Sequence, residues 1–328
     1  MDDSGLIFPE TPNVEWDHVV GLDDAKTAIH ETIVLPFKFP SLFAGSRLSG
    51  PSNILLYGPP GTGTTHIVRA ASTLTNSTLF RVCCTTLIMN KTPQSILKHV
   101  FKLAQESTRA IIFLDKIDAL CIGSQETDVN EAWIEKQRNT IMELLVLMGN
   151  PAFYNRSSDK QMAVIGATNA PWLISRPILR RFLNRRYCPL PSVDARKRIL
   201  EIGLGDKVPS DLSPVDYDTL ALMTNGHTGA TISRLIKQAL AQASERHASS
   251  IHFKTTNVSA EDSDLVECMP CFPDNSGVSG VSGPQIRQLD AVVLPPVTLT
   301  DFLIVLNDAD VGEKIPEFDT EKYEQWKV

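Results

Sequence analysis

The sequence predicts an α/β protein: a large domain built on a mostly parallel sheet with helices on both faces, then a smaller helical domain. Three observations lead to this fold class. Short apolar runs bounded by turn residues recur through residues 1–190, apolar stripes at helical spacing lie between them, and the strand-like runs then stop. Strand and helix in alternation favour a parallel sheet buried on both faces.

The elements are expected in a regular order. The predicted strands are NILLY at 53–57, TLFRVC at 78–83, AIIFL at 110–114, MAVIGAT at 162–168 and RYCPL at 186–190. Predicted helices cover 67–74, 96–104 and 134–148, because their apolar residues share one face. We expect a large domain over 1–190 and a small helical domain over 191–328. The small domain carries an insertion at about 254–296, rich in Ser, Asp, Gly and Pro, before TLTDFLIVLND forms a C-terminal helix.

Composition narrows the function classes. A net charge of −7 without a cluster of lysines or arginines argues against direct nucleic-acid binding and against a polybasic membrane anchor. MDDSGLIFPETPN has no signal-peptide pattern, and no run reaches the roughly 18 apolar residues of a membrane span. We therefore expect a cytoplasmic protein with reduced cysteines. Cys268 and Cys271 form a lone CxxC, whereas a structural zinc site needs four ligands.

The strand NILLY runs directly into a glycine-rich loop and a helix, GPPGTGTTHIV from Gly58 to Val68. Glycines let backbone N–H groups turn toward a polyphosphate, and the start of the helix adds partial positive charge. A tight turn without a ligand is the alternative. The predicted phosphate-binding residues are Gly58, Pro59, Pro60, Gly61, Thr62, Gly63, Thr64, Thr65 and His66.

The loop departs from the usual pattern at one position. Thr64 stands where a lysine normally contacts the β- and γ-phosphates, whereas Thr65 keeps a hydroxyl for magnesium. Losing a charge-assisted contact of roughly 1.5–3 kcal/mol weakens ATP binding by about one to two orders of magnitude.

A second departure lies at the end of the predicted strand 110–114. Asp115 can hold magnesium, directly or through water, but the next residue is Lys116, where a glutamate usually activates the attacking water. A protonated lysine accepts no proton, so an effect of roughly 10²–10⁴ on the rate is lost. Lys116 is either a solvated charge at the strand end or a substitute for the positive charge that Thr64 lacks.

These segments, together with PNVEWDHVVGLDDAK, IGATNAPW and LRRFLNRRYCPLP, resemble the meiotic clade of AAA ATPases, which includes katanin, spastin and fidgetin. The resemblance is strongest to the vacuolar protein sorting ATPases that disassemble ESCRT-III filaments, because IHFK, MPCFPDN and VTLTDFLIVL look like their β-domain insertion and late helix. It covers nearly the whole chain. It implies an AAA+ P-loop NTPase large domain and a small C-terminal helical domain with a β-rich insertion.

The resemblance also implies roles for further residues. It implies a ring, usually a hexamer, that binds ATP with Mg²⁺ between subunits and threads a polypeptide through its pore. Gly21 would lie near adenine, Asn169 would sense the γ-phosphate, Arg180 and Arg181 would reach the neighbouring subunit's nucleotide, and Gly226 and Gly229 would open a sensing helix. Surface solvation for the two arginines and a plain helix cap for the two glycines are the alternatives.

Two family features are missing from the sequence. The segment TTLIMNKTPQS lacks the aromatic residue that the first pore loop of the family carries. No helical module that recruits ESCRT-III tails precedes Pro12. We expect either that the sequence is part of a longer chain or that another subunit recruits the substrate.

The sequence thus predicts an assembly or regulatory subunit of a homo- or hetero-oligomeric ring with AAA paralogues. We expect it to bind ATP weakly, to be impaired in ATP hydrolysis and to be recruited to endosomes through partners. An active ESCRT-III disassembly ATPase is the alternative, in which Glu126, Asp128 or Glu131 would orient water. A microtubule-severing ATPase and an inactivated copy without function are further alternatives.

Overall fold

A computed structural model describes residues 9–43, 53–121, 131–150, 160–205, 208–248, 252–258, 266–271, 281–282, 296–307 and 317–326. The chain forms two compact units, Met1–Pro191 together with Ile315–Val328, and Ser192–Lys314. Glu126 and Asp128 lie outside the described residues.

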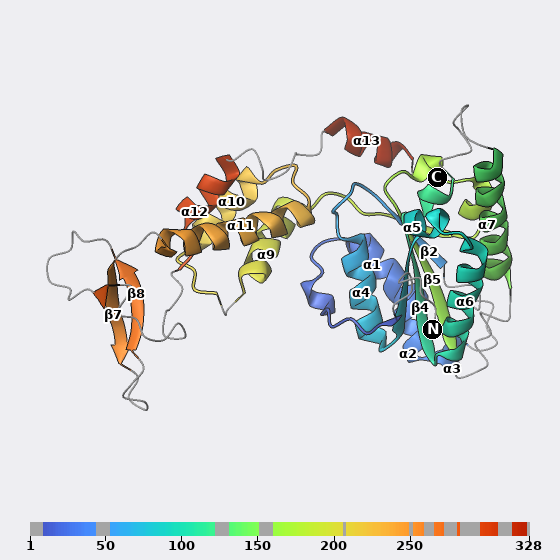
Figure 1. The fold of residues 1–328 in the computed structure, drawn as a ribbon, viewed down its shortest axis with the longest axis horizontal. Coiled ribbons are helices and arrows are strands. Elements are labelled where there is room, and N and C mark those ends of the chain that lie inside the picture. The colour runs from blue at the N-terminus through green and yellow to red at the C-terminus, as the bar shows by residue number, and fades with distance from the viewer. Residues whose placement is uncertain are drawn as a thin grey trace. The chain divides into compact units, whose positions relative to one another are not determined.

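The first unit is built on a sheet of strand order β1-β3-β4-β5-β2-β6. Figure 1 labels its strands β2, β4 and β5. All neighbouring strands are parallel except β1, which pairs antiparallel with β3. The strands are β1 Pro9–Glu10, β2 Asn53–Tyr57, β3 Thr78–Cys83, β4 Arg109–Asp115, β5 Gln161–Thr168 and β6 Asn184–Tyr187. The last strand begins and ends earlier than the predicted 186–190.

Helices cover both faces of this sheet. The helices of the first unit are η1 Trp16–His18, α1 Asp23–Ile29, η2 His30–Val34, α2 Leu35–Lys38, α3 Pro40–Phe43, α4 Thr64–Thr75, α5 Cys84–Met89, α6 Pro93–Glu106, η3 Ile117–Leu120, α7 Glu131–Gly149, η6 Pro171–Leu173, α8 Arg176–Leu179 and α13 Glu317–Gln325. No described helix is long and apolar enough to cross a membrane.

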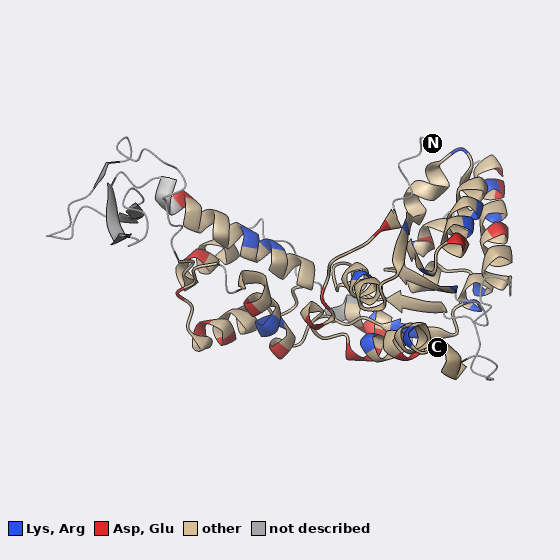
Figure 2. Cartoon of the chain, turned by 90° about the horizontal axis from the view of Figure 1, so that it is seen from below, with Lys and Arg blue, Asp and Glu red and all other residues tan. Residues whose placement is uncertain are grey.

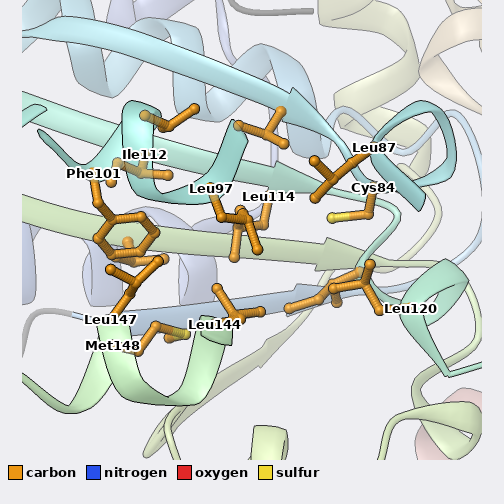
Figure 3. Close-up of a cluster of buried hydrophobic side chains, with 14 of the residues drawn as sticks. Cys84, Leu87, Leu97, Phe101, Ile112, Leu114, Leu120, Leu144, Leu147 and Met148 are labelled. Atoms are coloured by element: carbon orange, nitrogen blue, oxygen red, sulfur yellow. The ribbon is translucent and has the colours of Figure 1, made fainter. Parts of the chain in front are cut away.

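The core has two halves because successive residues of a strand point to opposite faces. On one face Ile112 and Leu114 of β4 pack with apolar residues of α6 and α7 (Figure 3). On the other face Ile111 and Phe113 pack with apolar residues of α1 and α4, among them Ile67. Burial on both faces explains why the strands read as continuous apolar runs.

The second unit is helical and carries a small sheet. Its helices are α9 Val193–Leu204, α10 Pro214–Met223, α11 Gly229–Ala248 and α12 Leu299–Asn307, and its strands are β7 His252–Val258, β8 Val266–Cys271 and β9 Val281–Ser282. The strand order β8-β7-β9 gives the expected insertion a β-structure. Cys268 and Cys271 lie on β8, but their side chains are outside the described part. Figure 2 shows acidic and basic residues interspersed along the helices of both units.

The C-terminal end differs from the expectation. The predicted last helix is α12, but the chain continues into α13, and residues 315–328 belong to the first unit rather than to the small helical domain. The reason is packing: Tyr323 of α13 is buried and stacks on Tyr187, and Trp326 meets the ring of Tyr57 edge-on. Helix α13 has only 9 residues and is mostly polar, so it gives a weak sequence signal and the pattern missed it.

Gly58 packs so closely that a side chain has no room. A Cβ there would lie 2.2 Å from the carbonyl oxygen of Cys188, a backbone atom that cannot rotate away. Gly58→Ala should therefore lower the free energy of unfolding by about 1–3 kcal/mol, measured by thermal or urea unfolding. Gly203→Ala is the control, because its Cβ would meet only the end of the Ile236 side chain, at 2.4 Å. Equal losses in the two variants would contradict this account.

Candidate nucleotide-binding site

Parallel pairing brings several strand ends to one edge of the sheet. Tyr57 of β2 pairs with Thr168 of β5 and with Tyr187 of β6, while Leu114 of β4 pairs with Gly166 of β5. The carboxyl ends of parallel strands are where ligands bind in open α/β sheets. The predicted phosphate loop leaves β2 at this edge, and the N–H of Gly58 donates to the carbonyl of Thr168 at 3.3 Å.

The loop has the backbone that its glycines predict. Gly61 has φ +84° and Gly63 has φ +100°, a region that side-chain-bearing residues rarely adopt. The hydroxyl of buried Thr62 donates to the carbonyl of Pro59 at 3.0 Å, which tightens the turn. Gly63 is the N-cap of α4, so no cap side chain covers the first amides of this helix. Such uncapped amides suit a phosphate.

The first turn of α4 supplies hydroxyls but no fixed positive charge. Thr64 and Thr65 are partly exposed, and His66 is exposed. The pKa of His66 is lowered from its usual 6.5, first by partial burial of the ring and then by the charge of Arg69. His66 is therefore neutral at pH 7 and does not replace the lysine that the pattern lacks at position 64.

The turn formed by Gly21 and Leu22 approaches this loop through the Leu22 side chain. Gly21 and Leu22 have φ of +67° and +58°, and this turn leads into α1. The Cδ1 atom of Leu22 lies 3.7 Å from the place that a Cβ on Gly63 would take. A role in holding adenine stays a prediction.

The carboxylate of Asp115 already has a cation beside it. Nη2 of Arg81 on β3 donates to Oδ2 of Asp115 at 2.8 Å. Lys116, which follows, is exposed and has φ +56°, and its backbone is the N-cap of η3. Sequence reasoning missed Arg81. The available signal was an arginine inside the otherwise apolar strand TLFRVC, two residues before its end.

This ion pair bears on the predicted magnesium ion. Magnesium binds protein through anionic carboxylates and retains several waters. Here the donors are the Thr65 hydroxyl and a carboxylate whose charge Arg81 neutralises. No group of three or more His, Cys, Asp and Glu side chains that could hold a metal occurs among the described residues. The donor set does not fit a magnesium ion held directly by Asp115, so that assignment stays a prediction with an observation against it.

Asn169 follows β5 at the same edge, on a segment fixed from both sides. The hydroxyl of Thr168 donates to Oδ1 of Asp118 at 2.6 Å and accepts from the N–H of Ala170 at 3.0 Å. The carbonyl of Asn169 accepts from the hydroxyl of Tyr323, at 2.5 Å. The predicted sensing role of the Asn169 side chain is not settled by these backbone contacts and stays a prediction.

A cluster of aromatic rings anchors α13 beside this edge. Tyr57 stacks on Tyr187 with centroids 5.6 Å apart, Tyr187 lies 6.1 Å from Tyr323, and the Trp326 ring lies 4.7 Å from Tyr57. Burial raises the pKa of Tyr187 to about 12. Nζ of Lys322 lies 3.7 Å from the centroid of Trp172, a cation–π geometry. Tyr57 is the last residue of β2 and directly precedes Gly58. The chain end that contains α13 therefore contacts the strand that leads into the loop.

Arg180 and Arg181 follow α8 and are exposed. The guanidinium of Arg181 lies along the end of α7, with Nη2 3.0 Å from the place a Cβ on Gly149 would take. The carbonyl of Arg181 accepts from the Asn53 side chain at 3.1 Å, which ties this segment to β2. Exposure is compatible with both the predicted contact to a neighbouring subunit and simple solvation, so the role stays a prediction.

Gly229 lies in the second unit, where it begins α11. The hydroxyl of Thr228 accepts from the N–H of Thr231 at 3.2 Å, so this threonine caps the helix. Gly226 has φ +80° in the preceding turn. The structure thus places the predicted helix start correctly, and a nucleotide-sensing role for Gly229 stays a prediction.

Comparisons with known proteins identify the family of the chain. Residues 54–190 match the family model "ATPase family associated with various cellular activities (AAA)". Vacuolar protein sorting-associated protein 4B of Pongo abelii is 36% identical over 311 residues, 93% of this chain and 67% of that protein. Protein SUPPRESSOR OF K(+) TRANSPORT GROWTH DEFECT 1 of Arabidopsis thaliana is 33% identical over 328 residues, 96% of this chain and 72% of that protein.

A katanin relative and two solved structures also match the chain. A katanin p60 ATPase relative of Danio rerio is 31% identical over 98% of this chain and 59% of that protein. The solved FIGL-1 AAA domain is 25% identical, with a TM-score of 0.71 over 99% of this chain and 92% of that chain. A chain solved for katanin self-assembly is 25% identical, with a TM-score of 0.65 over 97% of this chain and 93% of that one.

The chain spans about two thirds of the length of the curated relatives it matches. These findings confirm the predicted family and the AAA+ α/β fold. The chain belongs to the AAA family of ATPases, in the group that contains vacuolar protein sorting-associated protein 4 and katanin.

Proposed function

We propose that this chain is an assembly or regulatory subunit of an AAA ring, which binds ATP weakly and does not hydrolyse it by itself. The observation that carries the proposal is Lys116 directly after Asp115 at the end of β4. A cation stands where the reaction requires a group that accepts a proton from water. The retained loop geometry supports nucleotide binding, and the lost charges account for the weak affinity and the lack of turnover.

The affinity argument rests on the first turn of α4. Uncapped amides and the glycine backbone remain, but Thr64 is neutral and the lowered pKa of His66 leaves the imidazole neutral at pH 7. One charge-assisted phosphate contact is missing, which corresponds to roughly 1.5–3 kcal/mol. ATP should therefore bind about 10- to 100-fold more weakly than to a loop with the lysine.

The hydrolysis argument rests on the end of β4. Lys116 is exposed and has a left-handed backbone, and no carboxylate follows Asp115 directly. Glu131, an alternative water-orienting residue, is exposed at the start of α7. Loss of a general base costs about 10²–10⁴ in rate.

A subunit without turnover still serves a ring if it completes a neighbour's site. Arg180 and Arg181 are exposed and held on a segment anchored to β2 by Asn53. An arginine supplied to another subunit's nucleotide contributes about 10³–10⁵ in rate. We propose that these arginines act on active AAA paralogues in a mixed ring.

The relatives' names suggest the process. The name of vacuolar protein sorting-associated protein 4B supports placing this ring in vacuolar protein sorting. From the resemblance of the sequence we further propose ESCRT-III-like polypeptides as the substrate of the ring, and recruitment from the cytoplasm to endosomes through partners. The connection between α5 and α6 is short and polar, with Asn90, Lys91 and Thr92 after the exposed Met89. It offers no aromatic grip, so the active paralogues would pull the polypeptide.

Purified chain should release phosphate from ATP no faster than buffer, because it lacks a general base. The combined change Thr64→Lys, Arg81→Ser and Lys116→Glu restores the phosphate contact, frees Asp115 and supplies a carboxylate, and should raise turnover at least about 10²-fold. Lys116→Glu alone, without the phosphate contact, should stay near background. Steady ATP turnover by the unchanged chain, free of contaminating enzyme, would favour the active-ATPase alternative and refute the proposal.

Mixing the chain with an active paralogue should raise ATP turnover per active site, because its arginines complete neighbouring sites. Arg180→Ala combined with Arg181→Ala should abolish the increase while co-elution with the paralogue persists. Arg176→Ala, an exposed arginine of neighbouring α8, is the matched control and should keep the increase. An unchanged turnover in the mixture, or failure to co-assemble, would count against the proposal.

A further inference from the structure

Arg81 and Asp115 form an ion pair on the face of the sheet that α4 covers. Arg81 pairs with Phe113 across β3 and β4, and Asp115 lies two residues beyond Phe113, so all three side chains share a face. Phe113 packs with Ile67 of α4. The pair therefore lies on the loop side of the sheet, at the end of β4.

The contact has the geometry of a strong charge-assisted hydrogen bond. Nη2 of Arg81 and Oδ2 of Asp115 are 2.8 Å apart, and the Asp115 side chain is only 14% exposed. The pKa of Arg81 is raised, first by this hydrogen bond and further by the charges of Asp115 and Glu10. Among the described residues Nε of Arg81 is buried and has no hydrogen-bond partner. The guanidinium thus stays charged and fixed against this carboxylate.

A magnesium ion bound directly to Oδ2 of Asp115 would have to displace this guanidinium. Removing the carboxylate from Arg81 leaves a partly buried cation without its counter-ion, and a second cation would then lie beside it. Lys116 adds a further positive charge at the next residue. Each of these charges opposes a divalent ion at the same place.

The net charge of the site equals that of an ordinary P-loop site even without a metal ion. In an ordinary P-loop site one lysine and one magnesium ion face two carboxylates, which leaves one net positive charge. Here Arg81 is paired with Asp115 and Lys116 follows Asp115 in the chain, so these three residues carry the same single positive charge with no metal bound. Thr64 and His66 contribute none at pH 7.

We propose that Arg81 takes the place of magnesium at Asp115, so that this loop binds ATP or ADP in its metal-free form. The inference rests on the proposed function in that it takes the loop to bind a nucleotide. Arg81 then determines which form of the nucleotide the site accepts.

The test compares nucleotide affinity with and without magnesium. Titration of the full chain with a fluorescent ATP analogue should give dissociation constants in magnesium and in EDTA that agree within about twofold. Arg81→Ser exposes the Asp115 carboxylate, so this variant should bind at least about tenfold more tightly in magnesium than in EDTA.

Arg69→Ser is the matched control for this comparison. Arg69 has the same 38% side-chain exposure as Arg81, it also faces a carboxylate, Glu10 at 3.2 Å, and its Nε is likewise buried without a partner among the described residues. Its replacement should leave the ratio between the two buffers near one. Tighter binding of the unchanged chain in magnesium by about tenfold, or an Arg81→Ser variant still indifferent to magnesium, would overturn the inference.

A second measurement needs no nucleotide. Arg81→Ser and Asp115→Asn should each lower the unfolding midpoint, and the double variant should lower it no further than either change alone. Additive losses would show that the pair does not exist in solution and would overturn the inference. The three variants can show that the ion pair is intact while the chain binds no nucleotide in either buffer. That result would refute nucleotide binding and this inference. Ring assembly would still be tested separately, by co-elution with the active paralogue.

Discussion

The parallel hydrogen bonding of β2 with β5 and of β5 with β4 is the constraint on which the site depends. Because these strands are parallel, their carboxyl ends lie at one edge of the sheet. The phosphate loop, Asp115 and Asn169 are therefore on adjacent strand ends. Both faces of the sheet must be covered for such pairing, and the two halves of the core meet this need. The chemistry of the site can change without loss of the fold because the core residues lie elsewhere.

Three charge differences distinguish this edge from that of an ordinary ATPase, and they compensate one another. A lysine is missing from the loop, a lysine replaces a glutamate after Asp115, and an arginine faces Asp115 from β3. Each difference alone would unbalance a polyphosphate site. Together these residues carry one net positive charge, and the proposals of weak nucleotide binding and of lost hydrolysis rest on this charge pattern.

The chain end contributes to the same edge. Tyr323 and Trp326 connect the backbone of Asn169 with Tyr57, which precedes the loop. Aromatic stacking and a hydrogen bond from the Tyr323 hydroxyl hold α13 at this edge. The strand that carries the loop is therefore held both by its neighbours in the sheet and by a helix that is distant in sequence.

The sequence alone determined the fold class, the loop and the two substitutions. Continuous apolar runs such as 110–114, glycines before a helix, and the identities of Thr64 and Lys116 are local facts that spacing and chemistry suffice to interpret. Tertiary structure decided the partner of Asp115, which lies 34 residues away, and the contact of Tyr323 with Asn169, which spans 154. Such contacts depend on strand order and register, because a shift by one residue turns a side chain to the other face. A pattern of apolar residues specifies which face is buried but not which neighbouring strand supplies the charge beside it.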